Sequence, residues 1–125
     1  MADALDAALV RHFELIARDN TAAAEVYADD AVLEFVQSGE RIRGRSNIVA
    51  SRDAHPGPPT RFEVHRVVGG GETRTAEITM WIEGEEPHPL VAVVDLRDGL
   101  VVRERIYVAE PWEPPAYRAQ WVERF

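Results

Sequence analysis

Apolar residues in the first third of the chain recur with the spacing of a helix. The members of this apolar face fall three or four positions apart: Leu5, Leu9, His12, Phe13 and Ile16. The spacing predicts an amphipathic helix over residues 4–18. Asp19-Asn20-Thr21 is typical of a helix start and predicts a short second helix over 22–27, which Asp29 and Asp30 would end as cap and turn residues. A third helix is predicted over 45–53, before a proline-rich run.

Most of the remaining chain alternates between apolar and polar residues, as half-buried strands do. Two short strands are predicted over 31–36 and 41–43, and four longer ones over 60–68, 73–82, 90–96 and 100–109. Gly69-Gly70-Gly71 and Asp98-Gly99 supply the residues that tight turns between antiparallel strands need. Because the run 90–96 is almost continuously apolar, it is predicted to be a central strand covered on both faces.

The alternation also assigns side chains to strand faces. The first long strand would carry Phe62, Val64 and Val68 on one face, and the last would place together Leu100, Val102, Glu104, Ile106 and Val108. Helices followed by long antiparallel strands predict an α+β fold in one domain, residues 1–125. In this fold a cone-shaped, curved antiparallel sheet wraps around three N-terminal helices, and its concave side leaves a cavity that is the default ligand site.

Composition narrows the class of function. The 125 residues include 14 arginines, no lysine, 22 acidic residues and no cysteine, for a formal net charge of −8. Disulfides, thiolate nucleophiles and lysine Schiff bases are therefore excluded, and the acidic balance argues against nucleic acid as a partner. No apolar run is long enough to span a membrane, and the acidic start of the chain is unlike a signal peptide, so a cytoplasmic location is expected.

Two ionisable residues stand out because they fall on apolar faces. His12 is either a general acid or base, or a histidine held by one hydrogen bond at the cavity wall. Glu104 either forms an ion pair with an arginine such as Arg52, or has a pKa raised by desolvation, as a catalytic acid would. His55 and His88, which adjoin prolines, are expected to be solvated. No two histidines have the spacing of metal ligands, so no metal site and no cofactor are expected.

Several short motifs resemble the nuclear transport factor two-like (NTF2-like) superfamily. They are Tyr27-Ala28-Asp29-Asp30-Ala31, then Glu34, Gly44 and Ile48, and later Asp98-Gly99-Leu100-Val101-Val102. The resemblance is closer to the SnoaL-like branch, which includes polyketide cyclases and ketosteroid isomerases, and it covers nearly the whole chain in element order and spacing. It specifies the fold better than the chemistry, because this superfamily hosts isomerases, dehydratases, cyclases, hydrolases and non-enzymes.

The ketosteroid isomerases offer the sharpest comparison within this resemblance. Glu34 matches an isomerase glutamate, whereas Phe35 occupies the position of the catalytic base. His12, within Arg11-His12-Phe13-Glu14-Leu15, takes the place of an oxyanion-hole tyrosine, and Ala92 takes that of a protonated aspartate. Two of the three catalytic groups are thus missing and the third is replaced. The chain is therefore not expected to be a ketosteroid isomerase.

The same resemblance implies which residues face the cavity. The implied ligand-binding residues are mostly apolar: Tyr27, Phe35, Ile78, Met80, Ile82, Ala92, Ile106 and Val108. Since convex sheet faces in this superfamily commonly dimerise, it also implies a homodimer through the outer sheet face, where Trp81 is predicted to lie. Trp112, Tyr117 and Trp121 are expected to cover the open end of the domain.

Two functions of different classes follow. The first is a small-molecule-binding SnoaL-like protein that acts on a hydrophobic substrate as a cofactor-independent isomerase, cyclase or dehydratase. His12 and Glu104 would be its acid/base pair, and Tyr27 would orient the ligand. The alternative is a non-catalytic ligand-binding or dimerisation module, which the missing isomerase carboxylates motivate. A filled cavity, with His12 and Glu104 locked to each other or to arginines, would favour this alternative.

Overall fold

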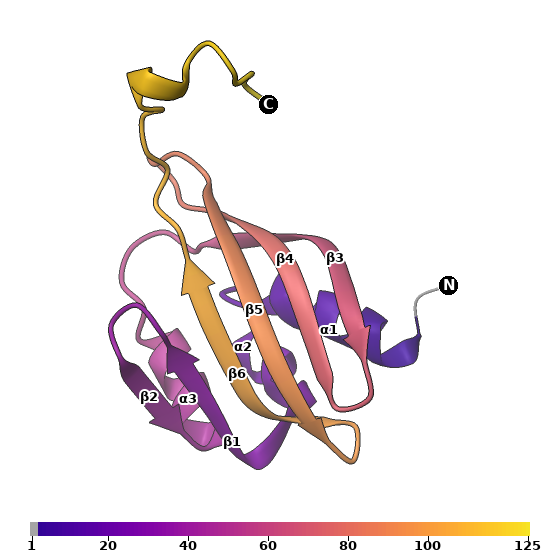
Figure 1. The fold of residues 1–125 in the computed structure, drawn as a ribbon. Helices are drawn as coiled ribbons and strands as arrows, with labels where there is room; N and C mark the ends of the chain where they lie inside the picture. The colour runs from indigo at the N-terminus through magenta and orange to yellow at the C-terminus, as the bar shows by residue number, and fades with distance from the viewer. Residues whose placement is uncertain (1–2) are drawn as a thin grey trace.

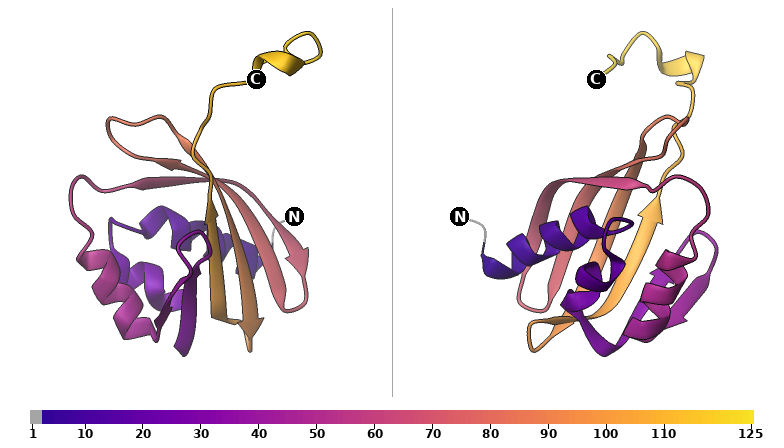
Figure 2. Two further views of the ribbon diagram at one scale, coloured as in Figure 1. Left: turned by 60° about the vertical axis from the view of Figure 1, so that its left-hand side comes forward. Right: turned by 180° about the vertical axis from the view of Figure 1, so that it is seen from behind.

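A curved six-stranded sheet wraps around the helices of the chain (Figure 1). In this computed structural model, which describes residues 3–125, the helices are α1 (Ala4–Leu15), α2 (Asn20–Ala23) and α3 (Arg45–Asp53), with 3-10 turns η1 (Ala24–Val26) and η2 (Ala116–Arg118). The strands are β1 (Tyr27–Phe35), β2 (Glu40–Arg43), β3 (Arg61–Gly70), β4 (Thr73–Trp81), β5 (His88–Arg97) and β6 (Leu100–Val108). All three helices lie on the concave side of the sheet (Figure 2), which confirms the predicted α+β cone.

The strand order is β2-β1-β6-β5-β4-β3. The four long strands β3 to β6 form the expected antiparallel meander, and β2 pairs antiparallel with β1. The pairing of β1 with β6 is parallel, which corrects the expectation of a wholly antiparallel sheet. The sequence does not reveal this direction, because no hairpin turn connects the two strands. The alternation of apolar and polar side chains is also the same in a parallel and an antiparallel pair.

The helices begin close to where the sequence predicts, but α1 ends earlier. Asp3 accepts a hydrogen bond from the Asp6 amide at the start of α1, and Asp19 accepts one from the Ala22 amide at the start of α2. The predicted helix 4–18 stops at Leu15, because Ala17 adopts a positive φ of 70° and its amide donates to the Asn20 side chain. The second helix is also shorter than predicted, because Tyr27 already belongs to β1.

Asp29 and Asp30 lie within β1 and do not end a helix, which corrects their predicted role as cap and turn residues. Both side chains are exposed at this end of the sheet. Asp29 forms an ion pair with Arg45, at the start of α3, and Asp30 forms one with Arg97, at the end of β5. The two aspartates therefore connect β1 to α3 and to β5 by surface ion pairs, each of which contributes little stability.

Two β-bulges change the faces that simple alternation assigns. In β3 the register shifts between Val64 and Arg66, so Val67 faces the core and Val68 is 41% exposed. In β6 the shift lies opposite Asp95 and Leu96, so Val101 is buried and Leu100 is 41% exposed. An extra residue on one strand of a pair inverts the orientation of every side chain beyond it. Beyond the bulge in β6, Glu104 and Ile106 face inward as predicted.

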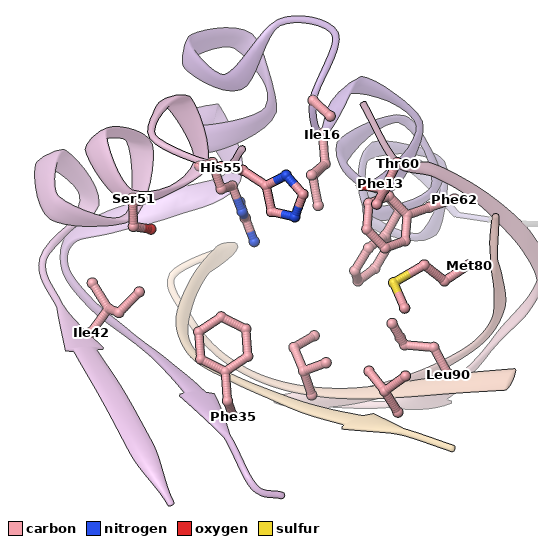
Figure 3. A pocket seen from close by; sticks show the side chains of 14 residues that line it. Phe13, Ile16, Phe35, Ile42, Ser51, His55, Thr60, Phe62, Met80 and Leu90 are labelled. Carbon is pink, nitrogen blue, oxygen red and sulfur yellow. The ribbon is translucent and has the colours of Figure 1, made fainter. Parts of the chain in front are cut away.

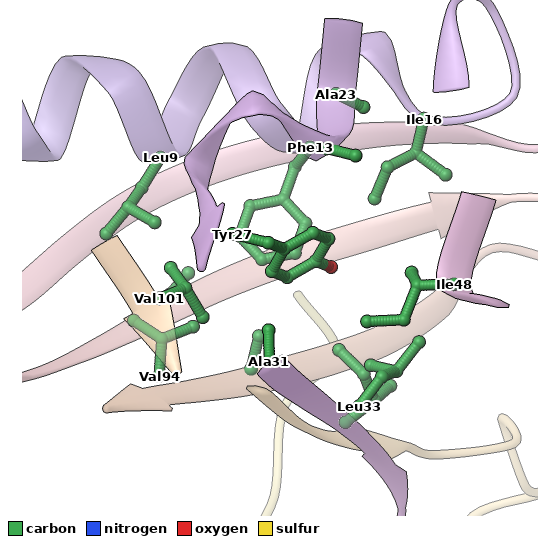
Figure 4. Close-up of a cluster of buried hydrophobic side chains, with 14 of the residues drawn as sticks. Leu9, Phe13, Ile16, Ala23, Tyr27, Ala31, Leu33, Ile48, Val94 and Val101 are labelled. Carbon is green, nitrogen blue, oxygen red and sulfur yellow. The ribbon is translucent and has the colours of Figure 1, made fainter. Parts of the chain in front are cut away.

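The core lies between the helices and the concave face of the sheet (Figure 4). Its largest fully buried apolar side chains come from α1, β1, α3, β5 and β6: Leu9, Phe13, Tyr27, Leu33, Ile48, Val94 and Val101. Two ionisable side chains, His12 and Glu104, are buried to the same degree. Buried groups of this kind need polar partners inside the protein.

Three further expectations about exposure are wrong. The C-terminal segment stands clear of the body of the domain (Figures 1 and 2), and Trp112, Tyr117 and Trp121 are about three-quarters exposed or more, at 81%, 77% and 74%. His88 is buried at the start of β5, not solvated. The outer face of β5 is not covered within one chain, since Val91 is exposed there.

No helix in the described part of the chain is long and apolar enough to cross a membrane.

Candidate functional site

A cavity of about 370 Å³ opens between α1, α3 and the sheet (Figure 3). The sheet and α1 present apolar side chains to it, whereas its polar side chains come from α3 and the loop that follows. The apolar part consists of Phe13, Ile16, Ala17, Phe35, Ile42, Phe62, Met80, Leu90, Ile106 and Val108, and the polar part of Ser51, Arg52, His55 and Thr60. This volume lies within the usual range of small-molecule sites.

A buried carboxylate lies behind the polar wall of the cavity. Glu104, on β6, accepts a hydrogen bond at Oε2 from His12 Nε2 at 2.9 Å. Its other oxygen, Oε1, accepts from the Tyr27 hydroxyl at 3.0 Å and from Arg52 at 3.3 Å. Three donors from α1, β1 and α3 thus converge on one side chain of the sheet. We call these four residues the Glu104 cluster.

The hydrogen-bond partners of His12 define where its protons lie. Nδ1 is 2.6 Å from the carbonyl oxygen of Ala23, which can only accept, so Nδ1 carries a proton. Nε2 lies 2.9 Å from Oε2 of Glu104 and 3.4 Å from the Tyr27 hydroxyl oxygen. One proton must lie between Nε2 and Oε2, because two unprotonated atoms at this distance would repel each other. The pair formed by His12 and Glu104 is therefore neutral as a whole.

The pKa directions agree with an ionised carboxylate. Burial acts to raise the pKa of Glu104, but the charges of His12 and Arg52 and the hydrogen bonds from His12 and Tyr27 outweigh it and hold that pKa below its ordinary value of 4.5. Burial, followed by the neighbouring Glu104 charge, raises the pKa of Tyr27 well above its ordinary value of 10.0. Tyr27 therefore stays a neutral phenol and donates its proton to Glu104. The predicted alternative in which Glu104 pairs with Arg52 is the one observed.

Arg52 belongs both to the Glu104 cluster and to the cavity wall. Its side chain is only 13% exposed, and the guanidinium carbon lies 5.6 Å from the centre of the Tyr27 ring, within cation–π range. One guanidinium nitrogen, NH2, donates to Glu104. The other, NH1, is buried and has no hydrogen-bond partner within residues 3–125.

The residues predicted to bind ligand divide into two groups. Phe35, Met80, Ile106 and Val108 line the cavity. The other four lie outside its lining: Tyr27, Ile78 and Ala92, which are buried, and Ile82, which follows β4. The proposed acid/base pair, His12 and Glu104, is brought together but is separated from the cavity by its wall.

Sequence reasoning missed the contribution of α3 to the cavity. His55, expected to be solvated, is exposed but directs its ring toward the cavity (Figure 3). The signal was available, because Ile48, Arg52 and His55 recur three or four positions apart and so share one side of a helical turn. Among residues 3–125, no group of three potential ligands is placed to hold a metal ion.

Comparison with known proteins places this geometry in a familiar fold. A family model described as a SnoaL-like domain matches residues 8–104. An NTF2-like protein of unknown function from Burkholderia xenovorans is similar over 95% of this chain and 93% of its own, with 40% sequence identity and a TM-score of 0.84. No curated protein matches the sequence at a significant level.

Two other solved structures carry names that describe an activity. A proposed ketosteroid isomerase from Kribbella flavida is 28% identical, with a TM-score of 0.84, over 97% of this chain and 89% of its own. An LEH-like epoxide hydrolase from M. tuberculosis is 20% identical, with a TM-score of 0.67, over 82% of this chain and 84% of its own. The second likeness concerns the fold alone.

Replacing Glu104 tests the assignment of the ionised carboxylate. Glu104→Gln leaves the buried Arg52 guanidinium without its counter-charge and disrupts the contact with His12, so we expect a loss of about 3–5 kcal/mol in the free energy of unfolding at neutral pH. Because the folded-state pKa of Glu104 lies below 4.5, its contribution is present above that pH and is lost as the pH falls through the folded-state value. Urea denaturation of both proteins from neutral to acidic pH should therefore show the difference shrinking below about pH 4.5.

The matched control is Glu77→Gln, which removes a carboxylate from an exposed ion pair with Arg66 on the outer face. It should cost much less, because water screens that pair. A difference between wild type and Glu104→Gln that stays constant under acid would contradict an ionised Glu104.

Proposed function

Because the chain belongs to the SnoaL-like domain family, within the NTF2-like superfamily, we propose that it binds a hydrophobic small molecule in the cavity beside α3. The observation that carries this proposal is the composition of the wall, where ten of the fourteen lining residues are apolar. Burying apolar ligand surface against such a wall is favourable by about 25 cal/mol per Å². The few polar groups on one side would orient the molecule.

The size of the cavity limits the ligand. A volume of about 370 Å³ lies near the lower end of the range of about 300–1,000 Å³ found for small-molecule sites, so we expect a small ligand. A single substituted ring or a short branched chain is of this size. Phe35 and Met80, on opposite sides of the cavity, would contact its apolar part (Figure 3).

The second candidate is a cofactor-independent isomerase, cyclase or dehydratase that uses acid/base chemistry. It is favoured by the short path from the cavity to the Glu104 cluster, since Arg52 both donates to the carboxylate and lines the cavity. The proposed isomerase from Kribbella flavida, which is 28% identical, supports it as well. In this candidate His12 and Glu104 exchange protons with the substrate once Arg52 moves aside, and Tyr27 fixes the carboxylate.

Assembly is a separate part of the proposal. The outer face of the sheet exposes Trp81, Val91 and Tyr107, and the last two are directly opposite each other on β5 and β6. A homodimer that packs these faces together would cover them, as the convex position of Trp81 suggests. This contact would leave the cavity open, because the cavity lies on the concave side.

Ligand binding can be followed at one methyl group. Met80 lines the cavity and the only other methionine in the sequence is Met1, so a ¹³C-methyl methionine spectrum has two signals to assign, one of them from the cavity wall. We expect titration with 4-phenyl-2-butanone to shift the Met80 signal. Val108→Trp, which fills the cavity from β6, should weaken binding by about tenfold or more, whereas Val68→Trp on the outer face should leave it unchanged. A Met80 signal that responds equally in both variants would contradict binding in this cavity.

Acid/base chemistry can be tested with the same ketone. If the second candidate holds, the wild type should accelerate exchange of the protons beside the carbonyl group into D₂O, as NMR would record. Glu104→Gln should slow this exchange by about a hundredfold, the lower range for loss of a general base. Exchange that is no faster than in buffer, at ligand concentrations that saturate Met80, would leave binding without catalysis as the function.

The dimer is tested by adding charge to the outer face. Sedimentation equilibrium should give twice the chain mass for the wild type and the chain mass for Val91→Glu, because a carboxylate would be buried without a partner. Val122→Glu, in the exposed C-terminal segment, is the matched control and should stay dimeric. A monomeric wild type at all concentrations would refute this interface.

A further inference from the structure

The Glu104 cluster contains more positive than negative charge. The proton in the 2.9 Å contact between His12 and Glu104 makes that pair neutral as a whole, Tyr27 is neutral, and Arg52 carries one positive charge. Arg52 has no acidic partner other than Glu104 within residues 3–125. The cluster therefore holds one uncompensated positive charge behind an apolar cavity, where the cost of an unpaired charge is highest.

The geometry shows where a compensating charge would bind. Arg52 contributes to the cavity wall, and its NH1 nitrogen has donors that no described residue accepts. One guanidinium nitrogen of Arg52 already donates to Glu104, and the other has no acceptor. Arg52 can therefore bind an additional carboxylate. The protein atoms do not supply that group, so a ligand in the cavity is the available source.

The composition of the wall points the same way. The chain has a formal net charge of −8 and 22 acidic residues, yet none of the fourteen lining residues of the described chain is acidic. The ionisable residues in the wall are Arg52 and His55, both basic. The carboxyl-terminal end of α3 adds a negative partial charge near Arg52, but at about half an elementary charge it does not cancel the excess.

We infer that the cavity is selective for a hydrophobic monoanion, such as a carboxylate with an aryl or branched alkyl group, whose charged end binds Arg52. This inference rests on the proposed function, because it specifies the class of molecule that the same cavity binds. The anion would neutralise the Glu104 cluster, and a small shift of the buried guanidinium toward the cavity would let it accept from NH1 as well. The apolar part would extend toward Met80 and Val108 on the sheet. Arg52 is thereby assigned as the residue that determines specificity.

The test compares two ligands that differ in charge and little else. 4-Phenylbutyrate and 4-phenylbutyramide have the same skeleton, a single substituted ring, which is small enough for this cavity. Dissociation constants are measured by titration calorimetry, and the Met80 methyl signal reports whether each ligand enters the cavity. We expect the wild type to bind the carboxylate about tenfold more tightly than the amide, or better, because a charge-assisted hydrogen bond replaces a neutral one.

Substitution of Arg52 then assigns the preference to one residue. Arg52→Gln should lose the preference for the carboxylate while retaining binding of the amide. Arg66→Gln, which makes the same change of charge on the outer face, should retain the preference. If Arg52→Gln does not fold, as an amide spectrum would show, the double variant Arg52→Gln/Glu104→Gln removes the buried cation together with its partner and should likewise lose the preference.

The outcomes separate this inference from the proposed function. Equal affinity of the wild type for both ligands, with Met80 shifting in each case, would overturn the selectivity for anions and leave the cavity as a hydrophobic binding site. A preference that persists in the folded Arg52 variant would overturn the assignment to Arg52. No Met80 response to either ligand would contradict the proposed function, and the inference with it.

Discussion

Glu104 is the buried charge on which the arrangement of the helices depends. It projects from the concave face of the sheet into a layer that is otherwise apolar, where an unpaired carboxylate would be prohibitively costly. Its donors come from three separate elements, His12 on α1, Tyr27 on β1 and Arg52 on α3. Each element must therefore take up a defined position relative to β6. Apolar packing alone tolerates small shifts of a helix, whereas a hydrogen bond to a buried carboxylate does not.

The same interaction explains why the cavity is polar on one side only. Arg52 cannot leave the interior without uncovering Glu104, so α3 presents a guanidinium to a space that the sheet and α1 line with apolar groups. Arg52 therefore both stabilises the buried carboxylate and sets the polarity of the cavity wall. The two hypotheses drawn from the sequence each find partial support here. His12 and Glu104 are locked to each other and to an arginine, as expected of a binding module, but the cavity is open, as expected of a protein that accepts a substrate.

The sequence predicts those features of the fold that depend on neighbouring residues, such as the spacing of apolar side chains and the residues in turns. The third helix, the meander of long strands and the inward orientation of His12 were predicted, and the pairing of Glu104 with Arg52 was one of two alternatives considered. The parallel pairing of β1 with β6 and the two bulges were not, because alternation contains no information about a distant partner strand or an inserted residue. The aromatic residues near the C-terminus look like core residues by composition and are nevertheless exposed. Of the residues that line the cavity, several on the sheet were predicted from the sequence. Arg52 and His55 were not, because the prediction considered only apolar faces.

The charge of the Glu104 cluster depends on one proton, which lies between His12 and Glu104 and leaves the positive charge of Arg52 without compensation. Side-chain NMR of ¹⁵N-labelled His12 shows whether that proton is present. We expect two slowly exchanging protons at neutral pH, one that Nδ1 donates to the Ala23 carbonyl and one in the contact between Nε2 and Glu104. If no proton lies in the contact between Nε2 and Glu104, the charges of Glu104 and Arg52 cancel. The cavity would then have no uncompensated charge to recruit an anion, and the selectivity derived from it would be wrong.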